Sequence, residues 1–197
     1  AGGSRVRVGL LGGTFDPIHL GHLRAAETAR EGLGLDLVAF LPSGEPPHRT
    51  GPLAPALDRF TMACLASAGH PHLTVWDTEV LRPGPSYTVD TLACLRAERS
   101  DDELVLVVGS DTWPEMTGWR EPERLFSLAE VAVVGRPGQP SPAVTPPFPG
   151  ARVGRVDGPA LPISATSIRE RVRRGESVRY LVPVPVAEYI ARRGLYE

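Results

Sequence analysis

Two histidines follow a pair of glycines in the stretch GGTFDPIHLGH, which runs from Gly12 to His22. Glycine lets the backbone approach a phosphate closely, and imidazole nitrogens donate hydrogen bonds to phosphate oxygens. His19 and His22 are three residues apart, so they share one face if this segment is helical. The residue types and their spacing predict a site that binds a polyphosphate and stabilises charge developing on it. A pair of solvated surface histidines is the alternative interpretation.

The elements around this stretch predict where such a site would lie. The apolar run 6–11 is expected to be a strand that ends at the glycines, and a helix is expected to start near Ile18. Open α/β sheets bind ligands at the carboxyl ends of their strands, and a helix N-terminus favours an anion. Asp16 is expected to cap the helix, with Pro17 in its first turn. A side chain at Gly21 would crowd a bound nucleotide.

Short runs rich in valine and leucine alternate with helical patterns along the chain. This alternation predicts an α/β fold, a Rossmann-like doubly wound parallel sheet with helices on both faces and a small C-terminal helical part. Strands are expected at 6–11, 37–42, 73–77, 104–109, 130–135 and 152–156. Helices are expected at 20–32, 55–68, 87–99 and 121–128, then within 163–176 and 185–194. Ser167 and Glu170 have the spacing of a capping box.

Length and charge limit the classes of protein that the chain can represent. Its 197 residues predict one domain over residues 5–197, with residues 1–4 as a processing or cloning remnant. The net charge of −2 argues against duplex nucleic acid as a partner, and the absence of lysine excludes a catalytic lysine. No membrane span or signal peptide is apparent, so a cytoplasmic protein without a membrane partner is expected. The proline- and glycine-rich segment 135–150 is expected to be a surface loop.

Neither the cysteines nor the remaining histidines form a metal-binding pattern. Cys64 and Cys94 lie in expected helices and are interpreted as buried, reduced thiols. His70 and His72 flank a proline and are expected in a surface turn. We therefore expect no metal ligands from the protein.

The stretch around His19 and His22 resembles the nucleotidyltransferase superfamily that carries an HxGH signature. Its members join a nucleoside triphosphate to a phosphorylated partner and release pyrophosphate. The stretch by itself does not choose among the cytidylyltransferases, the phosphopantetheine enzyme and the pyridine-nucleotide enzymes.

Four further segments resemble the bacterial nicotinate mononucleotide adenylyltransferase family, and together they span almost the whole chain. They are LPSGEPPHR at 41–49, SYTVDTL at 86–92, GSDTWPEMTGW at 109–119 and ISATSIR at 163–169. The resemblance implies that ATP and nicotinate mononucleotide are the substrates and that deamido-NAD and pyrophosphate are the products. It also implies Mg²⁺ as a cofactor that accompanies ATP. A homo-oligomer is compatible with the sequence, which does not decide the oligomeric state.

The resemblance also assigns roles to individual residues. It implies that His19, His22 and Arg169 are catalytic. The implied ATP-binding residues are Gly12, Gly13, Thr14, Phe15, Gly109, Asp111, Ser164 and Ile168. The implied acceptor-binding residues are Ser43, Gly44, His48, Thr88, Trp119 and Arg120.

Several of these residues have a structural alternative. Asp111 follows a strand, where it can accept hydrogen bonds from ribose hydroxyls, but it could equally cap a helix. Trp119 offers a flat face to a pyridine ring or fills the core. Arg169 lies near the start of a late helix, where its guanidinium can clamp phosphate or remain solvated. His48 and Arg49 either cover the phosphates or lie in a plain exposed loop. Ser86 is expected to cap the helix that begins at Tyr87.

Two other functions remain to be separated from this one. The phosphopantetheine enzyme shares the first motif, but it gives no reason for SYTVDTL or for the spacing of Asp111 and Trp119. A non-enzymatic nucleotide-binding module would bind ATP without releasing pyrophosphate.

Overall fold

A six-stranded parallel sheet forms the centre of the computed structural model, which describes residues 5–47, 54–135, 143–159 and 161–197. Within these residues the strand order is β3-β2-β1-β4-β5-β6. The strands are β1 (Arg7–Gly13), β2 (Leu37–Pro42), β3 (Leu73–Val75), β4 (Glu103–Gly109), β5 (Glu130–Gly135) and β6 (Val153–Asp157). The predicted doubly wound parallel sheet is therefore confirmed, and β1 extends two residues further than expected, into the glycine pair.

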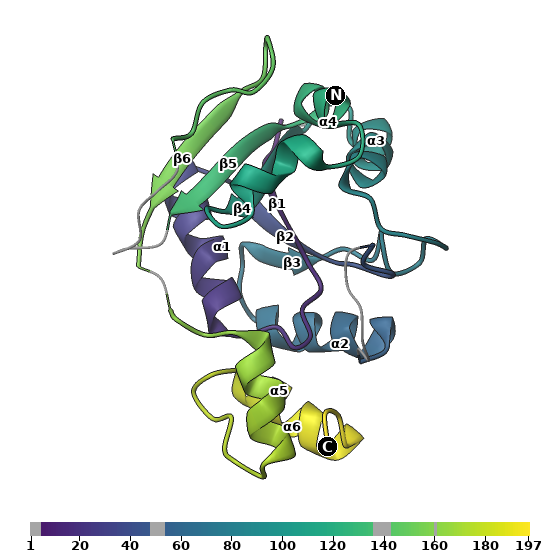
Figure 1. Ribbon diagram of the computed structural model, residues 1–197, viewed down its shortest axis with the longest axis vertical. Helices are drawn as coiled ribbons and strands as arrows, with labels where there is room; N and C mark the ends of the chain where they lie inside the picture. The colour runs from purple at the N-terminus through teal and green to yellow at the C-terminus, as the bar shows by residue number, and fades with distance from the viewer. Residues whose placement is uncertain (1–4, 48–53, 136–142, 160) are drawn as a thin grey trace.

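Helices cover both faces of this sheet (Figure 1). The helices of the chain are α1 (Leu20–Leu33), α2 (Ala56–Ser67), α3 (Thr88–Glu98), α4 (Pro122–Leu128), α5 (Ala165–Arg173) and α6 (Val184–Arg193), with a 3-10 helix η1 (Trp113–Gly118). Apolar side chains of α1 and α2 pack on one face, in a core that α6 extends, and those of α3, α4 and η1 pack on the other. Alternate residues of each strand serve the two cores: Val105 and Val107 face the first, and Leu104 and Leu106 face the second. This explains why the strands are apolar throughout.

The connection from β3 to β4 reverses the direction in which the sheet grows. Strand β1 pairs with β2 on one side and with β4 on the other, so that Val8 is opposite both Leu37 and Leu104. A crevice opens at such a reversal, outside the carboxyl ends of the two strands. The glycine pair ends β1 and therefore lies at this crevice.

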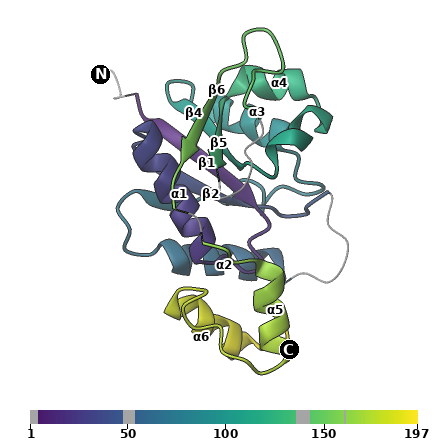
Figure 2. The same ribbon diagram turned by 60° about the vertical axis from the view of Figure 1, so that its left-hand side comes forward.

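The C-terminal helices lie beyond α2, at one end of the molecule (Figures 1 and 2). The contact with α2 has a polar part beside the shared apolar core: the buried carboxylate of Asp58 accepts hydrogen bonds from Tyr189 and Arg193 of α6. The backbone carbonyl of Leu181 also accepts a hydrogen bond from the amide of Leu20, at the start of α1. The end of the chain is therefore attached to the helix that follows the glycine pair.

Three expected helix caps are wrong, because each polar side chain has a different partner. Helix α1 begins at Leu20 with His19 as its N-cap, so Asp16 lies too far ahead to cap it and Pro17 precedes the first turn. Helix α3 has Tyr87 as its N-cap, while Ser86 accepts hydrogen bonds from a distant loop. Helix α5 is capped by Ser164, whose hydroxyl accepts the amide hydrogen bond of Ser167.

Candidate active site

A cavity of about 820 Å³ opens at the carboxyl ends of β1 and β4. Its volume lies in the range typical of small-molecule and cofactor sites. Most of the residues singled out from the sequence line it: Gly12, Gly13, Thr14, Phe15, His19, His22, Ser43, Thr88, Gly109, Asp111, Trp119, Arg120 and Ser164. Gly44, Ile168 and Arg169 do not line it, and His48 and Arg49 lie outside the described residues.

The glycine loop leaves room beside the backbone at one end of this cavity. A Cβ atom on Gly12 would meet no heavy atom within 4 Å, so the backbone there faces open space. Phe15 follows with a positive φ of 49° and a buried ring. The edge of this ring packs against Phe40 and His22, with centroids 5.6 and 5.0 Å away. The loop is therefore open towards the cavity and packed firmly behind it.

His19 and His22 lie side by side at the wall of the cavity. Their ring centroids are 3.7 Å apart and their planes are inclined by 24°. Nδ1 of His22 accepts a hydrogen bond from the backbone N–H of His19, at 3.2 Å. A neutral imidazole that accepts at Nδ1 carries its proton at Nε2, so the other nitrogen of His22 is a donor.

Gly21 lies between the two histidines and lines the cavity. A Cβ atom at this position would lie 2.9 Å from Nδ1 of His19 and 3.5 Å from the carbonyl oxygen of Leu161. The first of these distances is too short for the ring to stay where it is. A side chain at Gly21 would therefore displace His19, and not only a bound nucleotide.

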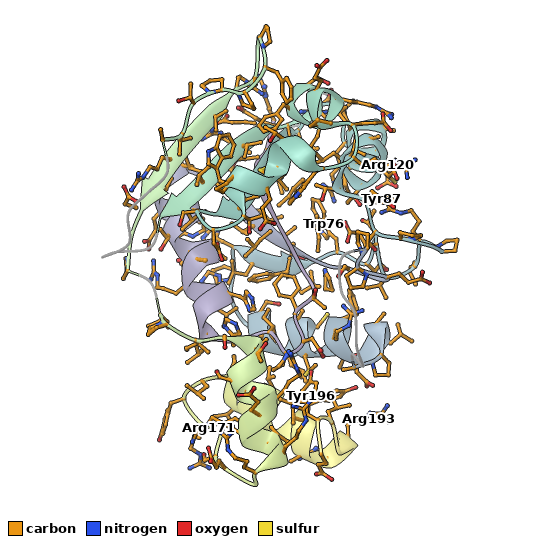
Figure 3. The ribbon with its side chains drawn as sticks, viewed as in Figure 1. Trp76, Tyr87, Arg120, Arg171, Arg193 and Tyr196 are labelled. Carbon is orange, nitrogen blue, oxygen red and sulfur yellow. The ribbon has the colours of Figure 1, made fainter. Side chains whose placement is uncertain are left out.

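Asp16 joins the glycine loop to the C-terminal part of the chain. Its buried Oδ1 accepts hydrogen bonds from the amide of Ala54 at 3.2 Å and from the hydroxyl of Tyr196 at 2.7 Å. Arg169 donates from Nη1 to the backbone carbonyl of Asp16 at 2.7 Å, and the same nitrogen lies 3.9 Å from Oδ2. Burial, together with the negative charge of Asp16, raises the pKa of Tyr196 well above its usual range. Tyr196, which the sequence did not single out, is shown among the C-terminal helices in Figure 3.

Arg59 is a second residue that the sequence analysis missed. This fully buried guanidinium donates to three backbone carbonyls, those of Ala54 at 3.0 Å, Thr14 at 2.8 Å and Gly44 at 2.9 Å. It therefore connects the loop after β1 with the loop after β2. A signal was present, because Arg59 shares the buried face of α2 with Met62 and Ala63, three and four residues later.

The loop after β2 forms part of the opposite wall. The amide of Ser43 donates to the carbonyl of Gly13 at 2.9 Å, which attaches this loop to the glycine pair. The amides of Gly44 and Glu45 donate to Oγ of Ser86 at 3.0 and 3.3 Å. Thr88 begins α3 two residues later, so the contact with Ser86 positions Thr88 relative to the loop.

Asp111, Trp119 and Arg120 come from the turn after β4 and from the segment after η1. Asp111 does not cap η1, whose N-cap is Thr112. Trp119 is half-buried: it packs against the core and also lines the cavity. Trp113 is buried in the core. The guanidinium of Arg120 lies over the ring of Tyr87, 4.6 Å from its centroid, as Figure 3 shows. This contact joins the segment after η1 to the start of α3.

Glu79 is a buried acid that the sequence analysis also missed. It lines the cavity, yet only 6% of its surface is exposed. Burial raises the pKa of Glu79, although hydrogen bonds from Thr91 and Ser86 and the positive charge of Arg82 act in the opposite direction. A buried acid beside a ligand cavity is a candidate functional group.

The remaining reactive groups lie away from the cavity. Cys64 and Cys94 are free thiols and are half-buried, which is less than expected, and burial raises the pKa of Cys64. His70 and His72 lie in the expected surface turn between α2 and β3. No group of three or more histidine, cysteine or acidic residues that could hold a metal ion occurs in the described part of the chain. In the same residues, no helix is long and apolar enough to cross a membrane.

This arrangement can bind a ligand that carries several phosphates and a flat ring. The glycine loop and the two imidazoles provide one polar wall, while Asp111, Thr88 and Trp119 offer a carboxylate, a hydroxyl and an aromatic face on the others. Such a cavity can align two phosphorylated molecules and stabilise charge on the phosphate between them.

Comparison with known proteins agrees with this description. A family model described as cytidylyltransferase-like matches residues 10–171. A protein of Thermomicrobium roseum, named "Probable nicotinate-nucleotide adenylyltransferase", is 47% identical over 195 residues, covering 96% of this chain and 91% of the relative. A protein of the same name from Thermus thermophilus is 47% identical over 191 residues, covering 97% of this chain and 100% of the relative.

The fold is also found among solved structures. The nicotinic acid mononucleotide adenylyltransferase of Plasmodium falciparum complexed with NaAD superposes with a TM-score of 0.79. The two chains are 16% identical, and 98% of each is covered. A second structure of that protein, complexed with APC, gives a TM-score of 0.77 with the same identity and coverage.

Proposed function

Because this chain belongs to the cytidylyltransferase-like family and, within it, to the nicotinate-nucleotide adenylyltransferases, we propose that it transfers the adenylyl group of ATP to nicotinate mononucleotide. The products are nicotinate adenine dinucleotide and pyrophosphate, and the reaction is a step of NAD biosynthesis. One observation carries the proposal: the stacked histidines line the same cavity as Thr88, at the start of α3, and Trp119, after η1. A donor of the adenylyl group and a pyridine-containing acceptor can therefore meet there.

The reaction needs no nucleophile from the protein. An oxygen of the acceptor's 5′-phosphate attacks the α-phosphorus of ATP, and a new P–O bond forms. The bond from that phosphorus to the oxygen that bridges it to the β-phosphorus breaks, and pyrophosphate leaves with the electron pair. The attacking phosphate is already an anion, so no general base is needed either. The protein contributes alignment and stabilisation of charge.

The histidines act on the phosphates of ATP. Nε2 of His22 carries a proton, because Nδ1 accepts the amide hydrogen bond of His19. That N–H donates to a phosphate oxygen and stabilises charge as the bond to pyrophosphate breaks. His19 supports the same phosphates from the stacked ring. Arg169, in the helix that Ser164 caps, is the third group that we assign to the departing pyrophosphate, and its guanidinium donates to the backbone carbonyl of Asp16.

The other residues hold the two nucleosides. Asp111 accepts hydrogen bonds from the ribose of ATP, and Ser164 lies at the N-terminus of α5, which favours the phosphates. Thr88, Trp119 and Arg120 face the pyridine ring and its carboxylate, and Ser43 lines the same wall. These roles are the ones that the family resemblance implies, and the positions of the residues around the cavity support them.

Mg²⁺ enters as part of the ATP substrate. The described residues offer no cluster of metal ligands, whereas Mg²⁺ is commonly held by the phosphates of a nucleotide and by water. When bound, the ion neutralises phosphate charge. The protein then binds the complex through its phosphate and ribose groups.

The test is pyrophosphate release with ATP and Mg²⁺, with nicotinate mononucleotide and nicotinamide mononucleotide supplied in parallel. We expect release with the nicotinate substrate. Release with phosphopantetheine alone would contradict the proposed acceptor and leave the phosphate role of His19 and His22 intact. Binding of ATP without release from any acceptor would identify a nucleotide-binding module instead.

A further inference from the structure

Glu79 is the buried acid at the cavity wall that the reaction described above does not use. Its carboxylate accepts a hydrogen bond from Oγ1 of Thr91 at 2.7 Å, and Thr91 in turn accepts one from Arg82 at 2.9 Å. The hydroxyl of Ser86 also acts on this carboxyl and lowers its pKa, against the effect of burial. Because Oγ of Ser86 already accepts two amide hydrogen bonds, the one proton of this hydroxyl is available for the carboxylate of Glu79.

These bonds connect two segments that face the acceptor. The amides that reach Ser86 belong to Gly44 and Glu45, in the loop after β2. Thr91 belongs to α3, one turn after Thr88. The same two segments also share a backbone hydrogen bond, from the amide of Ser86 to the carbonyl of Glu45 at 2.8 Å. The carboxylate of Glu79 therefore connects the loop after β2 to the first turn of α3.

The backbone of Glu79 packs against the same loop. A Cβ atom on Gly44 would collide with the carbonyl oxygen of Glu79. Only glycine allows this approach, which explains why Gly44 is needed although it does not line the cavity. Side chain and backbone of Glu79 thus hold the loop from two sides.

We propose that Glu79 is a positioning residue for the acceptor substrate, holding the loop 43–47 and the start of α3 at the separation that nicotinate mononucleotide requires. The inference rests on the proposed function, since it concerns the acceptor side of the same cavity. The proposed function places ATP against the glycine loop, Asp111 and α5, whereas Glu79 contacts α3 and the loop after β2. A change at Glu79 should therefore weaken the binding of the acceptor more than the binding of ATP.

The test is the variant E79Q. Glutamine keeps the size of the side chain but removes its charge and replaces one acceptor oxygen by an NH2 donor, so it weakens the contacts with the hydroxyls of Thr91 and Ser86. We expect the KM for nicotinate mononucleotide to rise about tenfold, as for the loss of one hydrogen bond. The KM for ATP should change less than about threefold. Calorimetry should show the same split in binding affinity.

D58N is the matched control. Asp58 is as buried as Glu79, with 5% of its surface exposed, and it also accepts a hydroxyl hydrogen bond, but it lies between α2 and α6. The D58N variant should lower the melting temperature without changing the KM for ATP or the KM for nicotinate mononucleotide. If E79Q behaves like D58N, or raises both KM values equally, Glu79 is structural only and the proposal is wrong.

S86A keeps the proposal testable if E79Q does not fold. It removes the acceptor of the Gly44 and Glu45 amides, so it should also raise the KM for nicotinate mononucleotide selectively, and an unchanged KM would refute the link. The double variant E79Q/S86A should be less impaired than the product of the single effects. A wild-type protein that is inactive with nicotinate mononucleotide would instead refute the proposed function, before any variant is compared.

Discussion

The imidazole rings of His19 and His22 are stacked 3.7 Å apart, and the backbone amide of the first donates to Nδ1 of the second. His19 is the N-cap of α1, so the pair belongs to the start of the helix and is held by it. The hydrogen bond fixes the proton of the neutral His22 ring at Nε2. This geometry prepares a donor towards the cavity before any ligand binds.

The first prediction concerns the catalytic role of His19. In H19A we expect kcat to fall about 100- to 1,000-fold, as when one donor to a developing charge is removed. The fold should remain intact, as judged by circular dichroism and the melting temperature. H72A, at an exposed turn, is the matched histidine control and should retain full activity. Turnover of H19A close to the wild-type value would contradict the phosphate role of the pair.

The second prediction concerns Gly21, whose added Cβ would lie 2.9 Å from Nδ1 of His19. In G21A the ring must move, and a misplaced catalytic group costs about 10- to 100-fold in kcat. The melting temperature should not fall, because alanine stabilises a helix relative to glycine.

The double variant H19A/G21A separates this explanation from crowding of the nucleotide. If Gly21 acts through His19, adding G21A to H19A causes no further loss of kcat. If instead the two effects multiply, and the KM for ATP rises in G21A, the methyl group obstructs the nucleotide directly.

The sequence predicted the sheet well, because its signals are local. Strands buried on both faces are continuous apolar runs, and β2 and β5 were predicted with the bounds that the structure gives. The glycine pair after the first run placed the cavity at the carboxyl end of β1. The late helix that ends before Gly194 was also confirmed, and this glycine adopts the left-handed conformation with φ of 59°.

What the sequence missed depends on partners far along the chain. Asp16 has a typical capping residue type, but its partners are 38 and 180 residues away, at Ala54 and Tyr196. The partners of Ser86 are also distant, since it accepts hydrogen bonds from amides that lie 42 and 41 residues earlier. Local patterns carry no information on such contacts. Glu79 gave no local signal either, because it lies in a turn without helical or strand periodicity.

The third prediction concerns Arg59, which donates to carbonyls of the loops after β1 and β2. R59M leaves one buried and two part-buried carbonyls without this donor, and we expect the free energy of unfolding to fall by about 3–5 kcal/mol. Both loops should loosen, so the KM values of ATP and nicotinate mononucleotide should rise together. Urea unfolding and steady-state kinetics measure the two effects.

A second arginine provides the control for R59M. Arg96 also donates to backbone carbonyls, those of Leu128 and Asp102, but lies away from the cavity. R96M should lower the stability while leaving both KM values unchanged. If R59M has unchanged KM values as well, Arg59 only stabilises the fold and does not organise the cavity.

The last prediction concerns pH and the hydroxyl of Tyr196, which donates to Asp16 at 2.7 Å. Y196F removes a hydrogen bond to a charged group, so the free energy of unfolding should fall by about 1.5–3 kcal/mol at neutral pH. The pKa of Tyr196 is raised in the folded state, whereas in the unfolded chain it is about 10. Above that pH the unfolded chain releases a proton that the folded chain keeps. The stability of the wild type must therefore decrease as the pH rises, and this contribution is absent in Y196F.

Urea unfolding between about pH 8 and pH 11 tests this expectation, with the unfolded-state pKa near the middle of the range. The difference in stability between the wild type and Y196F should be constant below about pH 9 and should shrink above about pH 10. Y180F is the control, because Tyr180 is 80% exposed, and it should follow the wild type throughout. A difference that stays constant to the highest pH would mean that the hydroxyl of Tyr196 titrates alike in both states. The contact with Asp16 would then contribute to stability equally at every pH and would contribute nothing to the alkaline response.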